Sequence, residues 1–245
     1  MKAGASRSRS PPVWLFDLDN TLHDASNAVF GEMHAAIGEY VCAHVGVGGE
    51  EADRLRERYW KHYGATLLGL VRHHGVRPEH FLAETHRMPG LEARLRMSAH
   101  DRAALARLPG RKVILTNAPR AYAMRVLTTL RLARLFDDVI TIEDMTMFGS
   151  LRPKPDVRML RRVTTRLRIP PSRCVLVEDT LANLKAARAI GMHGAWMQRY
   201  LDGRFRGSRD LVNIGAQMRA PARRTCPKPP HRYAKIGALR HLARL

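Results

Sequence analysis

The sequence predicts an α/β fold, in which a doubly wound, Rossmann-like parallel sheet carries an inserted, all-helical cap domain. Three observations predict this class. Short apolar runs recur along the chain, most of them are separated by helical patterns, and the runs are continuous instead of alternating with polar residues. Continuous runs indicate strands that are covered on both faces, which is the situation of parallel strands between two layers of helices.

Apolar runs of strand length are expected to form the sheet. They are VWLF at 13–16, KVILT ending at Thr116, DVITI through Ile142, CVLV before Glu178, and GAWM near Trp196. After Tyr200 the chain is rich in glycine, arginine and proline, and an apolar pattern resumes from Tyr233 to Leu245. We therefore expect a loop after Tyr200, followed by a last strand and a helix.

Helical patterns occupy most of the intervals between these runs. AYAMRVLTTLRLARLF follows Pro119, and DVRMLRRVTTRLRI follows Pro155. A proline near the first turn of a helix is tolerated because its missing N–H has no helical partner there. Strand and helix therefore alternate along this part of the chain, as they do in a parallel sheet with crossover helices.

The pattern between residues 22 and about 108 is helical throughout. Apolar residues repeat at helical spacing in its first part, at Val29, Met33, Ile37 and Val41. A second helical segment spans 53–70, and Ser98 with Asp101 resembles a capping box that opens a helix ending at 109–110. This stretch is expected to be an inserted domain made of helices.

These patterns divide the chain into three parts. Residues 1–12 (MKAGASRSRSPP) are small, basic and proline-terminated, so a disordered leader is expected there. Residues 13–22 and 109–245 are expected to form the Rossmann-like core, and residues 23–108 the helical cap domain. Because the cap follows the first strand directly, we expect it over the carboxyl edge of the sheet, where it can close on a substrate.

The composition restricts the class of protein. A formal net charge of +20 attracts polyanions, but charge alone names no partner, and the low aromatic content of 6% accompanies no recognisable nucleic-acid module. We expect solvated basic faces and no nucleic-acid partner. No run approaches the roughly eighteen apolar residues that cross a bilayer, and the N-terminus lacks a secretory signal, so a cytoplasmic protein without a membrane partner is expected. The three cysteines lie far apart and are expected to be reduced thiols.

Polar residues gather where the predicted strands end and where one predicted helix begins. They are Asp17 and Asp19 after the first run, Thr116 and Asn117 after the second, Lys154 in RPKPD, and Glu178 and Asp179 after CVLV. Ligands of parallel sheets bind at this edge, because loops and helix N-termini converge there. Carboxylates about 4 Å apart repel by about 4 kcal/mol per pair at an effective dielectric of about 20, so a cation is required. Oxygen-only ligands point to Mg²⁺.

A site of this composition is equipped for phosphate chemistry. Mg²⁺, one lysine, a threonine hydroxyl and the N–H groups that begin the helix after Asn117 can hold a phosphate. One carboxylate can attack phosphorus to give an aspartyl-phosphate, and a second can protonate the leaving alkoxide and then deprotonate the attacking water. Asp17 and Asp19 can divide these roles only if the chain leaves strand geometry between them, since strict alternation sends both side chains to one face.

The motifs FDLDNTL, LTN, RPKPD and VEDT, in this order and with a helical insert after the first, resemble those of the haloacid dehalogenase superfamily of phosphohydrolases. The resemblance spans about Val13 to Trp196. It implies that Asp17 is the nucleophile and a metal ligand. It also implies that Asp19 is the general acid and base and gives its backbone carbonyl to the metal.

The same resemblance assigns the remaining polar residues. Phosphate binding is implied for Thr116, Asn117 and Lys154, a catalytic role for Lys154, and metal binding for Asp179 and Glu178. Typical members of the superfamily carry another aspartate four residues after the metal ligand, whereas this chain has Asn183. This departure concerns a contact around the metal shell and leaves the core mechanism intact.

Finer features resemble the pyrimidine 5′-nucleotidase branch of the superfamily. They are DLDNTLHDAS, the segment YWKHYGATLLGLVRHHG in the insert, LTNAP, and VEDTLANLKAA. That branch is a group of phosphoric monoester hydrolases that remove phosphate from nucleoside monophosphates such as UMP and CMP, and the resemblance implies the same substrates here. Substrate choice lies in the cap, where Tyr63, Arg72 and His73 are candidates for contacting a base or sugar.

Other functions stay open at this point. The scaffold also serves phosphatases of other small metabolites, such as sugar phosphates or phosphoglycolate-like acids, and phosphomutases, which return the phosphate to the substrate. Carbon–halogen cleavage is disfavoured, because a halide leaving group needs no acid and Asp19 supplies one. A basic nucleic-acid-binding protein on a retired phosphatase scaffold is disfavoured by the intact motifs. The sequence gives no oligomeric state.

Overall fold

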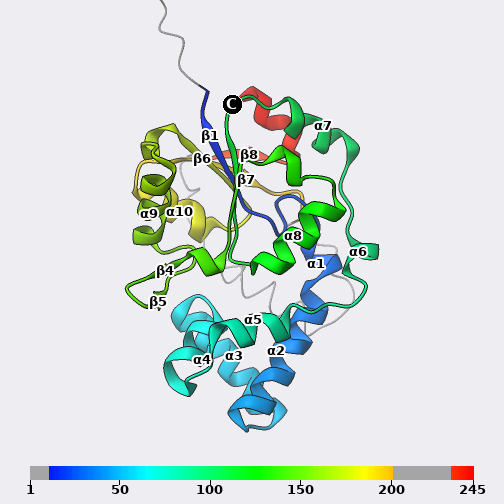
Figure 1. The fold of residues 1–245 in the computed structure, drawn as a ribbon, viewed down its shortest axis with the longest axis vertical. Coiled ribbons are helices and arrows are strands. Elements are labelled where there is room, and N and C mark those ends of the chain that lie inside the picture. The colour runs from blue at the N-terminus through cyan, green and yellow to red at the C-terminus, as the bar shows by residue number, and fades with distance from the viewer. Residues whose placement is uncertain (1–10, 201–232) are drawn as a thin grey trace, which may run out of the picture.

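A parallel sheet forms the centre of the protein (Figure 1). The structure, a computed structural model, describes residues 11–200 and 233–245. Within these residues the large sheet has six strands in the order β3-β2-β1-β6-β7-β8, and every neighbouring pair is parallel. The strands are β1 (Val13–Phe16), β2 (Lys112–Leu115), β3 (Asp138–Ile140), β6 (Cys174–Glu178), β7 (His193–Met197) and β8 (Ala234–Ile236).

All five predicted apolar runs contain a strand of this sheet, and β8 confirms the last strand that was expected after Tyr233. The helix that follows β8 is a 3₁₀ helix, η4 (Leu239–Arg244). The loop predicted after Tyr200 falls in residues 201–232, and most of the predicted leader falls in residues 1–10; both ranges lie outside the described residues.

Helices cover both faces of the sheet, as the continuous apolar strands require. Alternate side chains of β1 point to opposite sides: Trp14 and Phe16 belong to one apolar cluster, and Val13 and Leu15 to another. The first cluster includes residues of α8 (Arg120–Thr129), and the second includes residues of α9 (Val157–Leu167) and α10 (Leu181–Ala189). This arrangement confirms the doubly wound, Rossmann-like class.

The core contains shorter elements that the sequence patterns did not separate. The run expected to be a strand through Ile142 ends at Ile140, because Thr141 and Asp144 form a capping box that starts the 3₁₀ helix η2 (Ile142–Asp144). A two-stranded hairpin follows, and α8 ends before the predicted 136 because Arg131 adopts a left-handed conformation with φ of 56°. These additional elements are β4 (Thr146–Met147), β5 (Ser150–Leu151), η1 (Ala133–Leu135) and η3 (Pro171–Arg173).

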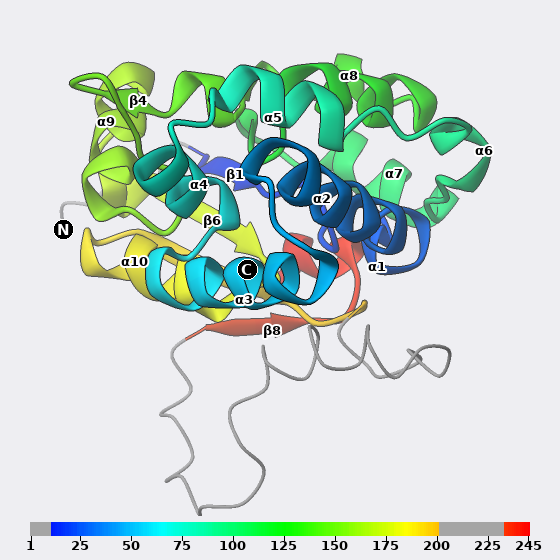
Figure 2. The same cartoon turned by 90° about the horizontal axis from the view of Figure 1, so that it is seen from below.

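The chain between β1 and β2 forms helices, as its pattern predicts. They are α1 (Ala25–Ala28), α2 (Phe30–Val45), α3 (Gly49–Tyr63), α4 (Thr66–His74), α5 (Pro78–Thr85), α6 (Leu91–Arg94) and α7 (Ala99–Arg107). Helices α2 to α5 lie together beyond the sheet (Figures 1 and 2) and share an apolar cluster of their own. Ile142 of η2 belongs to this cluster and Leu151 of β5 packs against it, so the core and these helices are in contact.

Helices α6 and α7 pack elsewhere. Their buried side chains Leu91 and Leu105 belong to the cluster that contains Phe16 of β1. The boundaries of a cap domain at residues 23–108 therefore stay a prediction, although every helix within them is now defined.

Two local predictions about these helices are wrong. The segment 53–70 is not one helix, because Gly64 takes φ of 78° and ends α3 before α4 begins. The capping box at Ser98 does not form, since the Ser98 side chain makes no capping hydrogen bond. Asp101 instead accepts hydrogen bonds from the backbone N–H groups of Leu239 and Arg240, at 3.1 and 3.4 Å, and ties α7 to η4.

None of the described helices is long and apolar enough to cross a membrane. Cys42 and Cys174, the cysteines within the described ranges, are both free thiols, in agreement with the expectation from their spacing.

Candidate active site

Three carboxylates meet at the carboxyl edge of the sheet. Strands β1 and β6 are neighbours with Phe16 opposite Val177, so the residues that follow them come together. Asp17 is fixed by its backbone N–H, which donates to the Val177 carbonyl at 3.0 Å. One oxygen each of Asp17, Glu178 and Asp179 lies within 4.8 Å of the others. The predicted convergence of these residues is therefore present in the structure.

Lys154 lies between two of these carboxylates. Its Nζ donates to Asp17 Oδ1 at 2.7 Å and to Glu178 Oε2 at 2.8 Å. The lysine is only 3% exposed, so both contacts are made inside the protein. A buried ammonium shared by two carboxylates is a strong electrostatic arrangement, and one that is costly to disrupt by removing one partner.

Asn117 fixes the position of Lys154. Its Nδ2 donates to the Lys154 carbonyl and its Oδ1 accepts from the Lys154 backbone N–H, both at 2.9 Å. The amide thus pairs with the lysine backbone on both sides, across 37 positions of sequence. The Asn117 side chain thus holds the lysine segment against the end of β2, and the phosphate contact that the resemblance implies for Asn117 stays a prediction.

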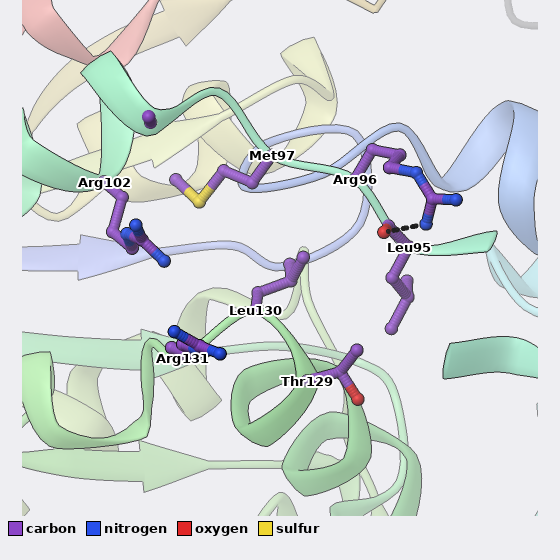
Figure 3. Close-up of a pocket in the computed structure, with 8 residues that line it drawn as sticks. Leu95, Arg96, Met97, Arg102, Thr129, Leu130 and Arg131 are labelled. Atoms are coloured by element: carbon purple, nitrogen blue, oxygen red, sulfur yellow. Dashed lines mark hydrogen bonds between the residues drawn. The ribbon is translucent and has the colours of Figure 1, made fainter. Parts of the chain in front are cut away.

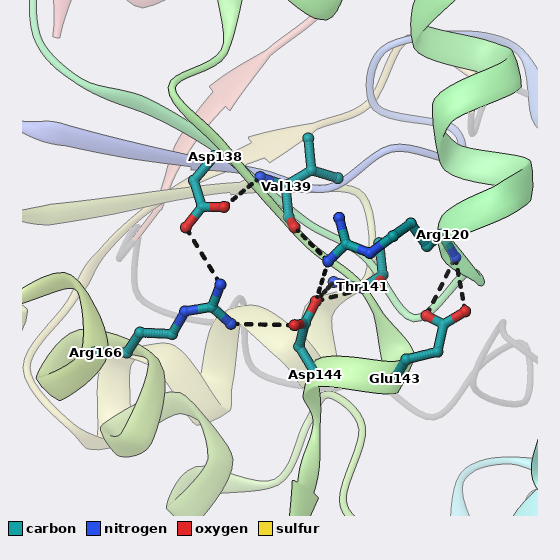
Figure 4. A network of polar contacts seen from close by, with 7 residues as sticks. All are labelled: Arg120, Asp138, Val139, Thr141, Glu143, Asp144 and Arg166. Carbon is teal, nitrogen blue, oxygen red and sulfur yellow. Dashed lines mark hydrogen bonds and ion pairs between the residues drawn. The ribbon is translucent and has the colours of Figure 1, made fainter.

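A network of ion pairs ties η2 to the first turn of α8 and to the last turn of α9 (Figure 4). Asp144 of η2 forms ion pairs with Arg120, at the start of α8, over 2.6 Å and with Arg166 of α9 over 3.2 Å. The backbone N–H of Arg120 also donates to both oxygens of Glu143, at 2.9 and 3.1 Å. The turn between β3 and the Lys154 segment is therefore held against both helices.

The electrostatics of the cluster show an excess of negative charge. Burial, followed by the charge of Glu178, raises the pKa of Asp17 to about 7, even though Lys154 acts in the opposite direction. Burial and Glu178 likewise raise the pKa of Asp179 well above its ordinary value. Burial alone lowers the pKa of Lys154, but its two carboxylate partners outweigh burial and raise it. One ammonium does not balance three carboxylates, so the site favours a further cation.

The other predicted residues lie beside this cluster. Thr116 is buried, its backbone N–H donates to Ile140 at 3.0 Å, and its Oγ1 accepts from the N–H of Ala118 at the same distance. Asp179 is held through its carbonyl, which accepts from Trp196 Nε1 at 2.8 Å. These contacts fix Thr116 at the end of β2 and Asp179 at the end of β6.

Asp19 stands apart from the three-carboxylate cluster. After β1 the chain leaves strand geometry, as the division of roles requires: Asp19 forms an isolated bridge with His23, and Asn20 adopts a left-handed φ of 56°. The Asp19 Oδ1 atom lies 2.6 Å from the Tyr122 hydroxyl and 3.0 Å from His23 Nε2. Burial favours the neutral carboxyl, but these hydrogen bonds outweigh it and hold the pKa of Asp19 below its ordinary value.

Tyr122 and His23 are site residues that the sequence reasoning missed. Tyr122 lies 103 positions from Asp19 in an apolar helical pattern, which is typical of a core residue. His23 lies four residues after Asp19, and that spacing is the one local signal for their contact. Burial, then Asp19, raises the pKa of Tyr122, so its hydroxyl stays protonated and acts as a donor.

The three cap candidates lie close together on α3 and α4. The Tyr63 hydroxyl is 2.5 Å from His73 Nε2, and the Arg72 guanidinium lies 5.9 Å from the centre of the Tyr63 ring. The Tyr59 ring stacks on His73 at 5.4 Å with an interplanar angle of 11°. The sequence candidates thus form one polar and aromatic group.

A pocket of about 220 Å³ lies away from the acidic cluster (Figure 3). It lies between the α6–α7 connection and the far end of α8, and its lining residues are Leu95, Arg96, Met97, Ala99, Arg102, Thr129, Leu130 and Arg131. None of the residues of the carboxylate cluster lines it. Because α8 begins at the catalytic edge and runs away from it, this pocket belongs to the opposite end of that helix.

The fold and the site together define a class of protein: a hydrolase domain of the Rossmann-like α/β type with a carboxylate cluster at the sheet edge. The chain belongs to the haloacid dehalogenase-like hydrolases, whose family model matches residues 13–191. The match starts at β1 and includes the helices between β1 and β2 and all the predicted site residues.

Similar proteins support this assignment. Phosphate metabolism protein 8 of Saccharomyces cerevisiae is 24% identical over 193 residues, which cover 74% of this chain and 59% of that protein. Validoxylamine A 7′-phosphate phosphatase of Streptomyces hygroscopicus subsp. limoneus is 34% identical over 79 residues, 32% of this chain and 35% of that enzyme. The chain therefore spans less than two thirds of the length of these curated relatives.

Solved structures share the fold at low identity. The hydrolase YfnB of Bacillus subtilis, whose crystal structure is described as bound to magnesium, superposes with a TM-score of 0.55 at 16% identity. The match covers 96% of this chain and 98% of YfnB. A likeness at this level of identity establishes the fold, and the chemistry rests on the residues of the site.

Proposed function

We propose that this hydrolase is a Mg²⁺-dependent phosphomonoesterase that acts through an aspartyl-phosphate on Asp17. One observation carries the proposal: a buried lysine bridges Asp17 and Glu178 at the carboxyl end of the central strand. Such a lysine screens the charge of a carboxylate, which can then approach the negatively charged phosphoryl group. The names of the yeast and Streptomyces relatives, both of which refer to phosphate, agree with this chemistry.

The residues at the site fit a magnesium ion. Three carboxylate groups within 4.8 Å of one another provide oxygen ligands only, which is the donor set that Mg²⁺ prefers. Both Glu178 oxygens already accept hydrogen bonds, Oε2 from Lys154 and Oε1 from the Thr180 N–H at 3.2 Å. Asp17, Asp179 and the Asp19 carbonyl would therefore bind the ion, and Glu178 would hold Lys154 and support the metal shell. Bound there, Mg²⁺ supplies charge neutralisation to the transferring phosphoryl group.

The chain's own residues divide the reaction into two steps. A carboxylate oxygen of Asp17 attacks phosphorus, the bond from phosphorus to the ester oxygen breaks, and Asp19 gives its proton to the leaving alkoxide. Asp19, now a carboxylate, takes a proton from water as that water attacks phosphorus, and the bond from phosphorus to Asp17 breaks to release phosphate. Lys154 and Thr116 hold the phosphoryl oxygens, and Asn117 keeps Lys154 in place.

The proposed substrates are pyrimidine nucleoside 5′-monophosphates such as UMP and CMP. Supporting this choice is the group formed by Tyr63, Arg72 and His73, which combines aromatic faces with hydrogen-bond donors suited to a base or sugar. A phosphatase of another small metabolite is the second candidate, and the Streptomyces relative favours it because its name refers to validoxylamine A 7′-phosphate. A phosphomutase on the same scaffold is the third.

The test is phosphate release from a panel of nucleotide, sugar and acid monophosphates, in Mg²⁺ and in EDTA. We expect Mg²⁺-dependent release that is greatest for UMP or CMP and that is abolished by Asp17→Asn. Asp53→Asn, which changes an aspartate 73% exposed on α3, is the matched control and should keep the wild-type rate. Turnover that survives Asp17→Asn would exclude the covalent mechanism. A substrate that is isomerised without free phosphate would identify a mutase.

A further inference from the structure

We propose that Tyr122 is a positioning residue that, together with His23, holds the Asp19 carboxyl with its Oδ2 atom toward the leaving group. This inference deepens the proposed function and rests on it. The Tyr122 hydroxyl donates to Asp19 Oδ1 at 2.6 Å, and His23 Nε2 lies 3.0 Å from the same oxygen. Two donors from different parts of the chain thus converge on one of the two carboxylate oxygens.

Hydrogen bonding distinguishes the two oxygens of Asp19. Tyr122 is 1% exposed and His23 is fully buried, whereas the Asp19 side chain is 23% exposed. In the part of the chain that the structure describes, no hydrogen bond reaches Oδ2 of Asp19. Oδ1 is therefore held by two buried donors, and Oδ2 is the oxygen left to face the leaving group.

This arrangement matters because a proton is transferred only over a short, aligned hydrogen bond of about 2.6–3.2 Å. A carboxyl that rotates freely presents either oxygen in many directions. Donors on Oδ1 fix the plane of the carboxyl, so Oδ2 is the atom that faces the ester oxygen when the proton is transferred and the phosphorus–oxygen bond breaks. The same atom then accepts the proton of the attacking water, and Asp19 returns to its initial state.

Tyr122 itself is held in place from two sides. Its helix, α8, starts close to the carboxyl edge of the sheet, and its ring belongs to the core cluster of that face. The His86 ring, at the end of α5, packs edge-on against Tyr122 with 5.8 Å between ring centres and an interplanar angle of 69°. His86 Nδ1 lies within hydrogen-bond distance of Thr85 Oγ1, at 2.9 Å, which fixes the His86 ring. The phenol of Tyr122 is therefore packed between Asp19 and the end of α5.

The Tyr122→Phe variant tests the proposal because it keeps the ring and removes only the donor. The readout is kcat/KM for UMP, whose sugar alkoxide needs a proton, and for p-nitrophenyl phosphate, whose phenolate leaves without one. We expect kcat/KM for UMP to fall by about 10- to 100-fold, the scale of partly lost acid catalysis, and that for p-nitrophenyl phosphate to fall less than about threefold. Tyr40→Phe, which removes a buried hydroxyl that contacts His80 at 2.9 Å in the cap, is the matched control.

His23 provides the second arm of the experiment. His23→Gln keeps a donor near the position of Nε2 and should retain most of the UMP rate, while His23→Leu should lose it with the same ester dependence as Tyr122→Phe. Equal falls for both esters in Tyr122→Phe, or no fall for either, would overturn the positioning role while leaving the proposed function intact. If the wild-type enzyme released no phosphate from either ester, the proposed function would fail, and the positioning role with it.

Discussion

Replacing Lys154 by methionine should destabilise the metal-free protein by about 3–5 kcal/mol, the cost of leaving buried charges without their partner. The lysine contacts Asp17 and Glu178 at 2.7 and 2.8 Å and is 3% exposed, so solvent does not replace it. Two carboxylates about 4 Å apart would then repel by about 4 kcal/mol at an effective dielectric of about 20, a figure of the same size. Methionine is unbranched like lysine and lacks only the terminal atom, so the change removes the charged group with a small change in packing.

The assay is urea unfolding at pH 7.5, in EDTA and in Mg²⁺. A ligand that binds only the folded protein stabilises it according to its affinity, and the variant's cluster is more negative than that of the wild type. We therefore expect Mg²⁺ to stabilise Lys154→Met by at least about 1 kcal/mol more than it stabilises the wild type. Lys185→Met, which changes an exposed lysine of α10, should alter neither value.

The reasoning would be refuted by either of two results. A Lys154→Met protein as stable as the wild type in EDTA would mean that the lysine does not neutralise the cluster. Equal stabilisation of both proteins by Mg²⁺ would mean that the ion and the ammonium do not act on the same carboxylates.

Three further predictions concern stability and are measured by urea unfolding. Gly69→Ala should destabilise the protein by about 1–3 kcal/mol, because the new Cβ would lie 2.1 Å from Tyr59 Cγ. This loss exceeds the gain from the higher helix propensity of alanine, so an increase in stability would contradict the close contact between α3 and α4. Burial, then a nearby arginine, lowers the pKa of His34 to about 4. Between pH 6.5 and 4 the unfolded chain therefore binds a proton that the folded chain does not, and the free energy of unfolding decreases as the pH is lowered. For this partly exposed residue the decrease should be roughly 2 kcal/mol, and His34→Gln should abolish it. Asp101→Ala should cost about 2–4 kcal/mol by leaving the Leu239 N–H unpaired and should speed proteolysis near the C-terminus; unchanged proteolysis would contradict this.

The sequence predicted the sheet and the convergence of the carboxylates, because both depend on local signals. An apolar run of four or five residues marks a strand wherever it occurs, and a polar residue directly after it must lie at the sheet edge. Asp17 and Glu178 were found in this way, and the register between β1 and β6 then brings them together. Lys154 was found from its flanking prolines, and its two carboxylate contacts agree with a position at that edge.

Contacts that depend on tertiary packing could not be predicted. Tyr122 reads as one more apolar position of a helix, and only the fold brings it within 2.6 Å of Asp19. Asp101 has the spacing of a cap residue, but backbone N–H groups nearly 140 positions later compete for it and win. The Asn117 amide pairs with the Lys154 backbone at both ends, a contact across 37 positions that no local pattern indicates.

The central claim is that Asp17 is the nucleophile of a Mg²⁺-dependent phosphomonoesterase. The most direct measurement is initial phosphate release from UMP and CMP by the wild type and Asp17→Asn, each with Mg²⁺ and with EDTA. We predict release by the wild type in Mg²⁺, none above background in EDTA, and none by Asp17→Asn in either condition. Phosphate release by Asp17→Asn at a rate comparable to the wild type would contradict the claim.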